Sequence, residues 1–177
     1  NGIMVEEYLY NSSMPIQLLP EEVASQIAAG EVVERPASVV KELLENALDA
    51  QATQVVIHIE SAGKKLVEVS DNGLGIPRQE LMLAVSRHAT SKLARADDLF
   101  HIATLGFRGE ALASIGSVSR MTVTSRTPDT EIAGRLRVEA GHTHPLESVG
   151  APTGTAIRVE DLFYNVPARL KFLKHDQ

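Results

Sequence analysis

The stretch PASVVKELLENALDAQATQVVIHIESAGKKLVEVSD, residues 36–71, contains the two patterns that decide the fold. Between Val39 and Leu48 apolar side chains recur in neighbouring pairs, four residues from one pair to the next, as on one face of an amphipathic helix. Pro36 suits the first helical position, where its missing N–H would have no partner. Residues 54–60 and 65–71 then alternate apolar and polar side chains on either side of a short turn. The stretch therefore predicts a helix over 36–50 followed by a β-hairpin.

Working outward, the remaining chain predicts helices mostly before a run of strands that short turns connect. That order favours an α+β fold, a two-layer sandwich of helices on a mixed, mostly antiparallel sheet. A helix over 19–30 is expected to end at Gly30, and a last helix to begin at Pro167. Further short helices are predicted near 78–87, 97–103 and 109–116, and strands near 117–125, 131–140, 142–148 and 154–160.

Composition excludes several classes of protein. The chain has 177 residues, a length that suits one domain, and no cysteine, which excludes a disulfide framework, a zinc ribbon and thiol catalysis. Seventeen basic and 23 acidic side chains leave a net charge of −6, which argues against a nucleic-acid binder acting alone. Residues 1–13 read as an added leader or a native extension, and residues 14–177 as the domain. Because residues 1–13 do not form a secretory signal, we expect a cytoplasmic protein.

The helix predicted over 36–50 carries an oxygen-rich stripe opposite its apolar one. At 100° per residue, Glu42, Glu45, Asn46 and Asp49 fall on one side. An amphipathic helix needs a solvated face, which is one explanation. The other is a Mg²⁺ site with a carboxylate left as a base, favoured because Lys41 is expected to point away from the stripe.

A second candidate site is SDNGLGIP, residues 70–77, where a strand is predicted to end. Asp71 would stand at the sheet edge, with Gly73 and Gly75 letting the backbone approach a ligand. An ordinary Asn-Gly turn is the alternative. Neither a Walker nor a Rossmann phosphate loop occurs in the sequence.

A third candidate is LGFRGEALASIG, residues 105–116, a glycine-rich turn that opens a helix and so could bind an anion. The alternative to an anion site is that Glu110, in the first helical turn, stabilises the helix dipole itself. The preceding 86–108 is either a loop or a lid. DLFYNVPARLKFL, residues 161–173, is expected to pack on the core, and a metal site at His142 and His144 is not favoured.

Together these motifs resemble the GHKL ATPases. ELLENALDA (42–50), DNGLG (71–75), GFRGEAL (106–112) and GT (154–155) stand in the order of that family's four signatures. Longer matches, including RHATSK and NVPAR, resemble the N-terminal ATPase domain of the MutL-type DNA mismatch repair proteins. The resemblance covers essentially all of residues 15–177.

The resemblance implies ATP and Mg²⁺ as cofactors and gives each motif a role. Glu42 would be the general base, Asn46 the Mg²⁺ ligand, and Asp71 the acceptor for the adenine amino group, with Thr155 helping through a water. Gly73 and Gly75 would give room for the base. The phosphates would be wrapped by Thr90, Ser91 and Lys92 of the lid and by Gly106, Phe107, Arg108, Gly109, Glu110, Ala111 and Leu112.

The resemblance also implies partners. A lysine from a following domain would reach the γ-phosphate, so we expect this chain alone to hydrolyse ATP very slowly. In the whole protein, ATP would drive homodimerisation and act as a switch between mismatch recognition and a nuclease and helicase. The full-length protein would bind DNA in the bacterial cytoplasm, where it would associate with the nucleoid. It would have no membrane partner.

Three other readings stay open from the sequence. Ser38 and Lys41 fit the S-x-x-K pattern of penicillin-recognising serine enzymes, and Ser70-Asp71-Asn72 fits their S-D-N, but no K-T-G occurs. A non-catalytic adaptor is the second, and a topoisomerase subunit of the same superfamily is the third.

Overall fold

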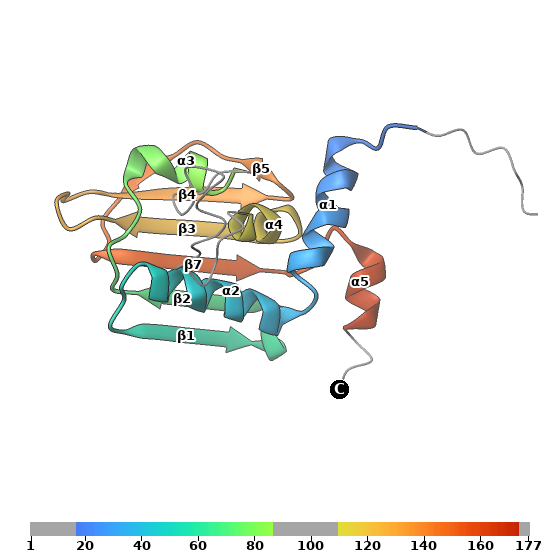
Figure 1. Cartoon of the computed structure of the whole chain (residues 1–177), viewed down its shortest axis with the longest axis horizontal. Helices are drawn as coiled ribbons and strands as arrows, with labels where there is room; N and C mark the ends of the chain where they lie inside the picture. Colours follow the sequence, from blue (N-terminus) through green and yellow to red (C-terminus); the bar gives the residue numbers. More distant parts are fainter. Residues whose placement is uncertain (1–16, 87–109, 174–177) are drawn as a thin grey trace, which may run out of the picture.

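In the computed structural model, which describes residues 17–86 and 110–173, the strands form one sheet with helices against a single face (Figure 1). Every strand pairing described is antiparallel, in the order β1-β2-β7-β3-β4-β5, with β6 also paired to β4. The two-layer α+β prediction is confirmed. The strands are β1 Val55–Glu60, β2 Leu66–Asp71, β3 Arg120–Arg126, β4 Ala133–Glu139, β5 His142–Thr143, β6 Glu147–Val149 and β7 Gly154–Glu160.

The predicted hairpin is present as β1 and β2, whose register pairs Ile57 with Val69. The last strand, β7, enters the sheet between β2 and β3 and places Thr155 opposite Asp71. The strand predicted over 142–148 is instead two short strands, β5 and β6. Pro145 lies between them, and a proline cannot donate the N–H that a continuous strand would need.

The helices are α1 Glu21–Val32, α2 Pro36–Asp49, α3 Leu81–Ala84, α4 Ala111–Ser117 and α5 Pro167–Phe172, with 3-10 turns at Ser61–Gly63 and Arg78–Glu80. Pro36 and Pro167 begin their helices as predicted. The helix expected over 78–87 is shorter than predicted, and the one near 97–103 lies outside the described residues. Figure 1 shows α2 lying over β2 and α4 over β3, while α1 and α5 stand beyond one end of the sheet. No helix in the described ranges is long and apolar enough to cross a membrane.

The prediction that α1 ends at Gly30 is wrong, because the helix continues to Val32. A side chain at Gly30 would overlap the guanidinium of Arg169, which comes from α5. Arg169 donates from Nη1 to the carbonyl of Val33 at 2.9 Å, and so places a cation at the C-terminal end of α1. The glycine is there to admit this contact rather than to stop the helix.

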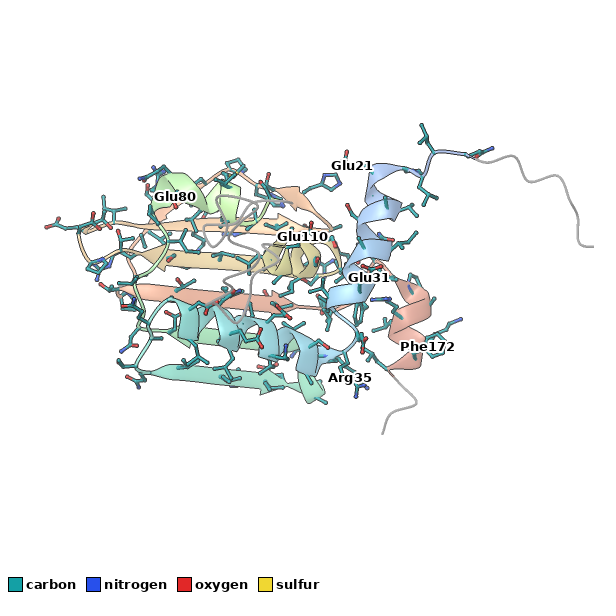
Figure 2. The ribbon with its side chains drawn as sticks, in the orientation of Figure 1. Glu21, Glu31, Arg35, Glu80, Glu110 and Phe172 are labelled. Carbon is teal, nitrogen blue, oxygen red and sulfur yellow. The ribbon has the colours of Figure 1, made fainter. Side chains whose placement is uncertain are left out.

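The core lies between the helices and the inner face of the sheet. Val39 and Leu43 of α2 and Ile115 of α4 are fully or almost fully buried there. The predicted apolar stripe of α2 extends too far, since Leu48 is 51% exposed. Residues 161–173 pack on the core as expected through Leu162, Phe163 and Leu173, whereas Phe172 projects from α5 (Figure 2).

Candidate functional site

Asp71 is the last residue of β2, and one of its carboxylate oxygens is held by two backbone N–H groups. Oδ1 accepts from Gly73 at 2.8 Å and from Thr155 at 3.3 Å. Burial raises the pKa of the Asp71 carboxyl above its ordinary value, and the two backbone donors partly offset that rise. Among the described residues Oδ2 has no hydrogen-bond partner. Asp71 is therefore a half-buried acceptor at the sheet edge, oriented by the backbone around it.

The glycines beside Asp71 allow close contacts within the protein. A side chain at Gly73 would meet the Ala50 carbonyl oxygen at 2.6 Å, and one at Gly75, where φ is +71°, would overlap the Arg126 backbone. Gly154, with φ of +116°, lies equally close to the backbone of Asp71. The structure thus gives these glycines a packing role, while room for a ligand at Gly73 and Gly75 stays a prediction.

Asn72 ties the glycine loop to the chain that leaves α2. Its Oδ1 accepts from the N–H of Thr53 and of Gln54, both at 2.9 Å, and its Nδ2 donates to Thr53 Oγ1 at 2.9 Å. The Leu74 N–H also donates to the Ala50 carbonyl at 2.9 Å. The end of α2 and the 71–75 loop are therefore held together. The sequence signalled only an Asn-Gly turn here and did not indicate this role.

Ser125 is a site residue that the sequence analysis missed. It is 1% exposed on the inner face of β3, where its hydroxyl contacts Thr155 and the loop residue Ile76. The signal in the sequence was the alternation of the strand. Met121, Val123 and Ser125 point to the same inner face of β3, so a serine occupies a position where the two preceding inward residues are apolar.

The oxygen-rich stripe of α2 is half-buried rather than fully solvated. The side chains of Glu42 and Glu45 are 23% and 19% exposed, and Asn46 and Asp49 are also only partly exposed. The expectation that Lys41 points away from them is wrong. Its Nζ lies 3.0 Å from a Glu45 carboxylate oxygen and 3.9 Å from one of Glu42.

The error over Lys41 has a simple physical cause. Its long flexible side chain can reach a carboxylate one turn on, although its Cβ projects elsewhere. The hydrogen bond to Glu45 raises the pKa of Lys41, so the ammonium stays charged.

The helix predicted after the glycine-rich turn is present as α4, close to the expected place. Glu110 is its N-cap residue and not part of the first turn, which holds no acidic side chain (Figure 2). Ala111 and Leu112 begin the helix, and Leu112 packs against the core. The other phosphate candidates, Thr90, Ser91, Lys92, Gly106, Phe107, Arg108 and Gly109, lie outside the described residues.

Asn46 and the carboxylates beside it on the half-buried flank of α2 supply oxygen atoms, the ligands that a hard cation prefers. No group of three histidine, aspartate or glutamate side chains in the described ranges is placed to hold a metal by itself. A metal at Asn46 would therefore need ligands from a bound molecule as well.

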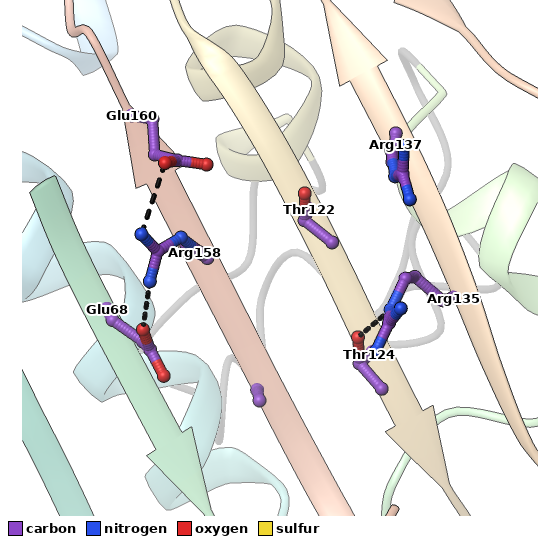
Figure 3. A pocket seen from close by; sticks show the side chains of 8 residues that line it. Glu68, Thr122, Thr124, Arg135, Arg137, Arg158 and Glu160 are labelled. Atoms are coloured by element: carbon purple, nitrogen blue, oxygen red, sulfur yellow. Dashed lines mark hydrogen bonds and ion pairs between the residues drawn. The ribbon is translucent and has the colours of Figure 1, made fainter. Parts of the chain in front are cut away.

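A pocket of about 330 Å³ lies on the face of the sheet opposite the described helices (Figure 3). Within it, Arg158 pairs with Glu68 at 2.9 Å and with Glu160 at 3.1 Å. The pair with Glu68 links β7 to β2, whereas Glu160 lies two residues from Arg158 on β7 itself. No predicted site residue in the described part of the chain lines the pocket.

The comparisons with known proteins agree with this arrangement. Residues 34–163 match the family described as "Histidine kinase-, DNA gyrase B-, and HSP90-like ATPase". Over 165 residues the chain is 57% identical to the "DNA mismatch repair protein MutL" of Actinobacillus succinogenes and 58% identical to that of Escherichia coli O9:H4. Each alignment covers 93% of this chain, which spans about a quarter of either relative, 26% and 27% respectively.

Solved structures give the same result. "Crystal Structure of N terminal domain of a DNA repair protein" has a TM-score of 0.72 and 33% identity, and the match covers 89% of this chain and 46% of that one. "Aquifex aeolicus MutL ATPase domain complexed with ADP" has a TM-score of 0.59 and 38% identity, covering 80% and 48%.

The family match overturns the penicillin-recognising reading of Ser38 and Lys41, and the named relatives favour mismatch repair over a topoisomerase subunit. The chain belongs to the histidine kinase-, DNA gyrase B- and HSP90-like ATPase family, and within it to the ATP-binding domains of MutL-type DNA mismatch repair proteins.

Proposed function

We propose that Asp71 and Thr155 receive the adenine of ATP. The observation that carries this proposal is the carboxylate of Asp71, whose Oδ1 accepts two backbone N–H groups while Oδ2 has no partner among the described residues. An ionised carboxylate only accepts hydrogen bonds, and the exocyclic amino group of adenine only donates them. A related MutL ATPase domain is described as complexed with ADP, which supports nucleotide binding at the same fold.

Glu42 and Asn46 of α2 would serve the phosphate end of the nucleotide. They lie one helical turn apart on the same half-buried flank, and the contacts of Asn72 and Ala50 hold the end of that helix against the adenine loop. Glu42 would accept a proton from the attacking water. Asn46 would offer its amide oxygen to Mg²⁺, which when bound neutralises phosphate charge.

The remaining phosphate contacts would come from Thr90, Ser91 and Lys92 and from the turn over Gly106–Leu112. α4 supports only the last part of this proposal, since it begins at Ala111. The domain would occupy residues 14–177, and a lysine from a following domain would complete the site. On that basis we expect turnover by this chain alone to be very slow.

In the whole protein, ATP binding would order these segments, favour a homodimer and pass mismatch recognition on to a nuclease and a helicase. Such a protein would act on DNA in the bacterial cytoplasm. These roles follow from the mismatch repair names of the relatives, of which this chain spans about a quarter.

Calorimetric titration with a non-hydrolysable ATP analogue and Mg²⁺ tests the proposal. Asp71→Asn keeps Oδ1 for Gly73 and Thr155 but replaces the second oxygen with a donor, so affinity should fall at least about tenfold. Asp161→Asn is the matched control, because Asp161 pairs with Arg120 beyond the opposite end of β7. Equal affinity of the wild type and Asp71→Asn would refute the adenine site.

A further inference from the structure

Ser125 joins three segments of the chain through one hydroxyl group. Its Oγ accepts from the Ile76 N–H at 2.7 Å, lies 3.0 Å from the carbonyl oxygen of Gly154 and lies 2.9 Å from Thr155 Oγ1. The serine is 1% exposed and Thr155 is 7% exposed, so water has little access to this cluster. The polar groups of the cluster must therefore find their hydrogen-bond partners largely among themselves.

A count of donors decides which way these hydrogen bonds run. A serine hydroxyl has one proton to donate and two lone pairs to accept with. All three contacts are satisfied together only if Ser125 donates to the Gly154 carbonyl and accepts from both Ile76 and the Thr155 hydroxyl. If Ser125 donated to Thr155 instead, the hydroxyl oxygen of Ser125 and the carbonyl oxygen of Gly154 would lie 3.0 Å apart with no proton between them.

The direction of these bonds fixes the chemistry of Thr155. With its proton directed to Ser125, the Thr155 hydroxyl has only lone pairs left for a ligand or a bridging water. Thr155 lies opposite Asp71 in the sheet, and its own N–H donates to the Asp71 carboxylate. The two side chains therefore present acceptors at the same place.

We propose that Ser125 is the positioning residue of the nucleobase pocket: it holds the Thr155 hydroxyl as an acceptor and thereby selects a purine that carries an amino group at this point. The inference rests on the proposed adenine site and goes beyond it, because Ser125 itself touches no nucleotide. Adenine carries a donating amino group at its 6-position, whereas guanine carries a carbonyl oxygen there. Two acceptors, the Asp71 carboxylate and the Thr155 hydroxyl, accommodate the amino group of adenine and repel the carbonyl oxygen of guanine.

The test compares the affinities of matched non-hydrolysable ATP and GTP analogues, with Mg²⁺, for the wild-type chain and its variants. Ser125→Ala frees the Thr155 proton to point at the ligand, so the preference for the adenine nucleotide should fall about five- to tenfold. Ser125→Thr keeps a hydroxyl at the position and should restore the preference. Ser125→Ala should have no further effect on the preference when Thr155→Val is already present.

Ser119→Ala is the matched control. Ser119 is also fully buried and donates its hydroxyl to the Ile115 carbonyl at 2.7 Å, but it contacts neither Thr155 nor Ile76. This variant should lower the melting temperature, as Ser125→Ala does, and leave the adenine preference unchanged.

The outcomes separate the two proposals. If the wild type prefers the adenine nucleotide and Ser125→Ala keeps that preference, the role of Ser125 is refuted and the adenine site stands. If additive effects are seen in the double variant, Ser125 does not act through Thr155 and the inference is likewise refuted. If the wild type itself binds neither nucleotide, the proposed function fails, and the inference about Ser125 fails with it.

Discussion

The Thr155 N–H donates to Oδ1 of Asp71 at 3.3 Å, although 84 residues separate the two in the chain. The bond exists because β7 enters the sheet beside β2 and brings the GT motif, which begins that strand, against the DNGLG loop. Two short motifs that are each ambiguous in sequence thus become one polar edge. The acceptor at this edge is where the proposed function and its pH dependence can be tested most directly.

Ligand affinity should depend on the ionisation of Asp71. Burial raises the pKa of its carboxyl, and the adenine amino group would bind the ionised form. ATP-analogue affinity should therefore fall as the pH drops through that raised pKa, and Asp71→Asn should lack this component. Calorimetry between about pH 4 and about pH 7 measures it. An identical pH profile for the wild type and Asp71→Asn would contradict the role.

The same carboxyl should affect stability in the opposite sense. Because its folded-state pKa lies above the unfolded value, the folded chain binds more protons between the two values. This contribution to the free energy of unfolding should fall as pH rises through that window and stay lost above it. Urea unfolding across the window should show a component of this sign in the wild type. Its persistence in Asp71→Asn would assign it to another group.

Glu42→Gln should separate hydrolysis from binding. The amide keeps the shape of the side chain but cannot take a proton from water, so turnover should fall by at least about a hundredfold while analogue affinity stays within about twofold. Glu45→Gln is the control, since Glu45 lies on the same flank of α2 and pairs with Lys41. Phosphate release with enzyme in excess measures the turnover of both variants. Similar losses in the two variants would place the base elsewhere.

Asn46→Ala should remove the Mg²⁺-dependent part of nucleotide affinity. The alanine offers no oxygen to the cation, whereas Asn46→Asp keeps one and should keep the dependence on Mg²⁺. The measurement is analogue affinity with Mg²⁺ and with a chelator. Should Asn46→Ala retain the full difference between the two conditions, Asn46 is not the ligand.

Gln51→Gly should stabilise the fold. Gln51 follows α2 with φ of 60°, and the bonds Gln51 N–H to Leu48 and Ala52 N–H to Ala47 close the helix end. Glycine adopts this backbone without strain, so the free energy of unfolding should rise by about 0.5–1 kcal/mol. Urea unfolding measures it, with Gln51→Ala as the control that keeps the strained φ and gains nothing. A loss of stability in Gln51→Gly would show that the side chain matters more than the backbone.

Local pattern by itself determined α2, the β1–β2 hairpin and the positions of the four motifs. Apolar periodicity and the Pro36 start signal depend only on neighbouring residues, so they can be read without a fold. The same local rules failed at Gly30 and Lys41, where the deciding contact came from a remote or flexible side chain. Arg169 explains the first, and the reach of the lysine across one helical turn explains the second.

Only the tertiary structure decided that β7 lies between β2 and β3, and with it the contacts of Asp71, Thr155 and Ser125. Strand order depends on how the whole sheet buries its apolar face, which no local pattern encodes. A buried serine on β3 looks like an interruption in the sequence. Its hydroxyl acquires a role only when β7 and the glycine loop arrive beside it with groups that need a partner.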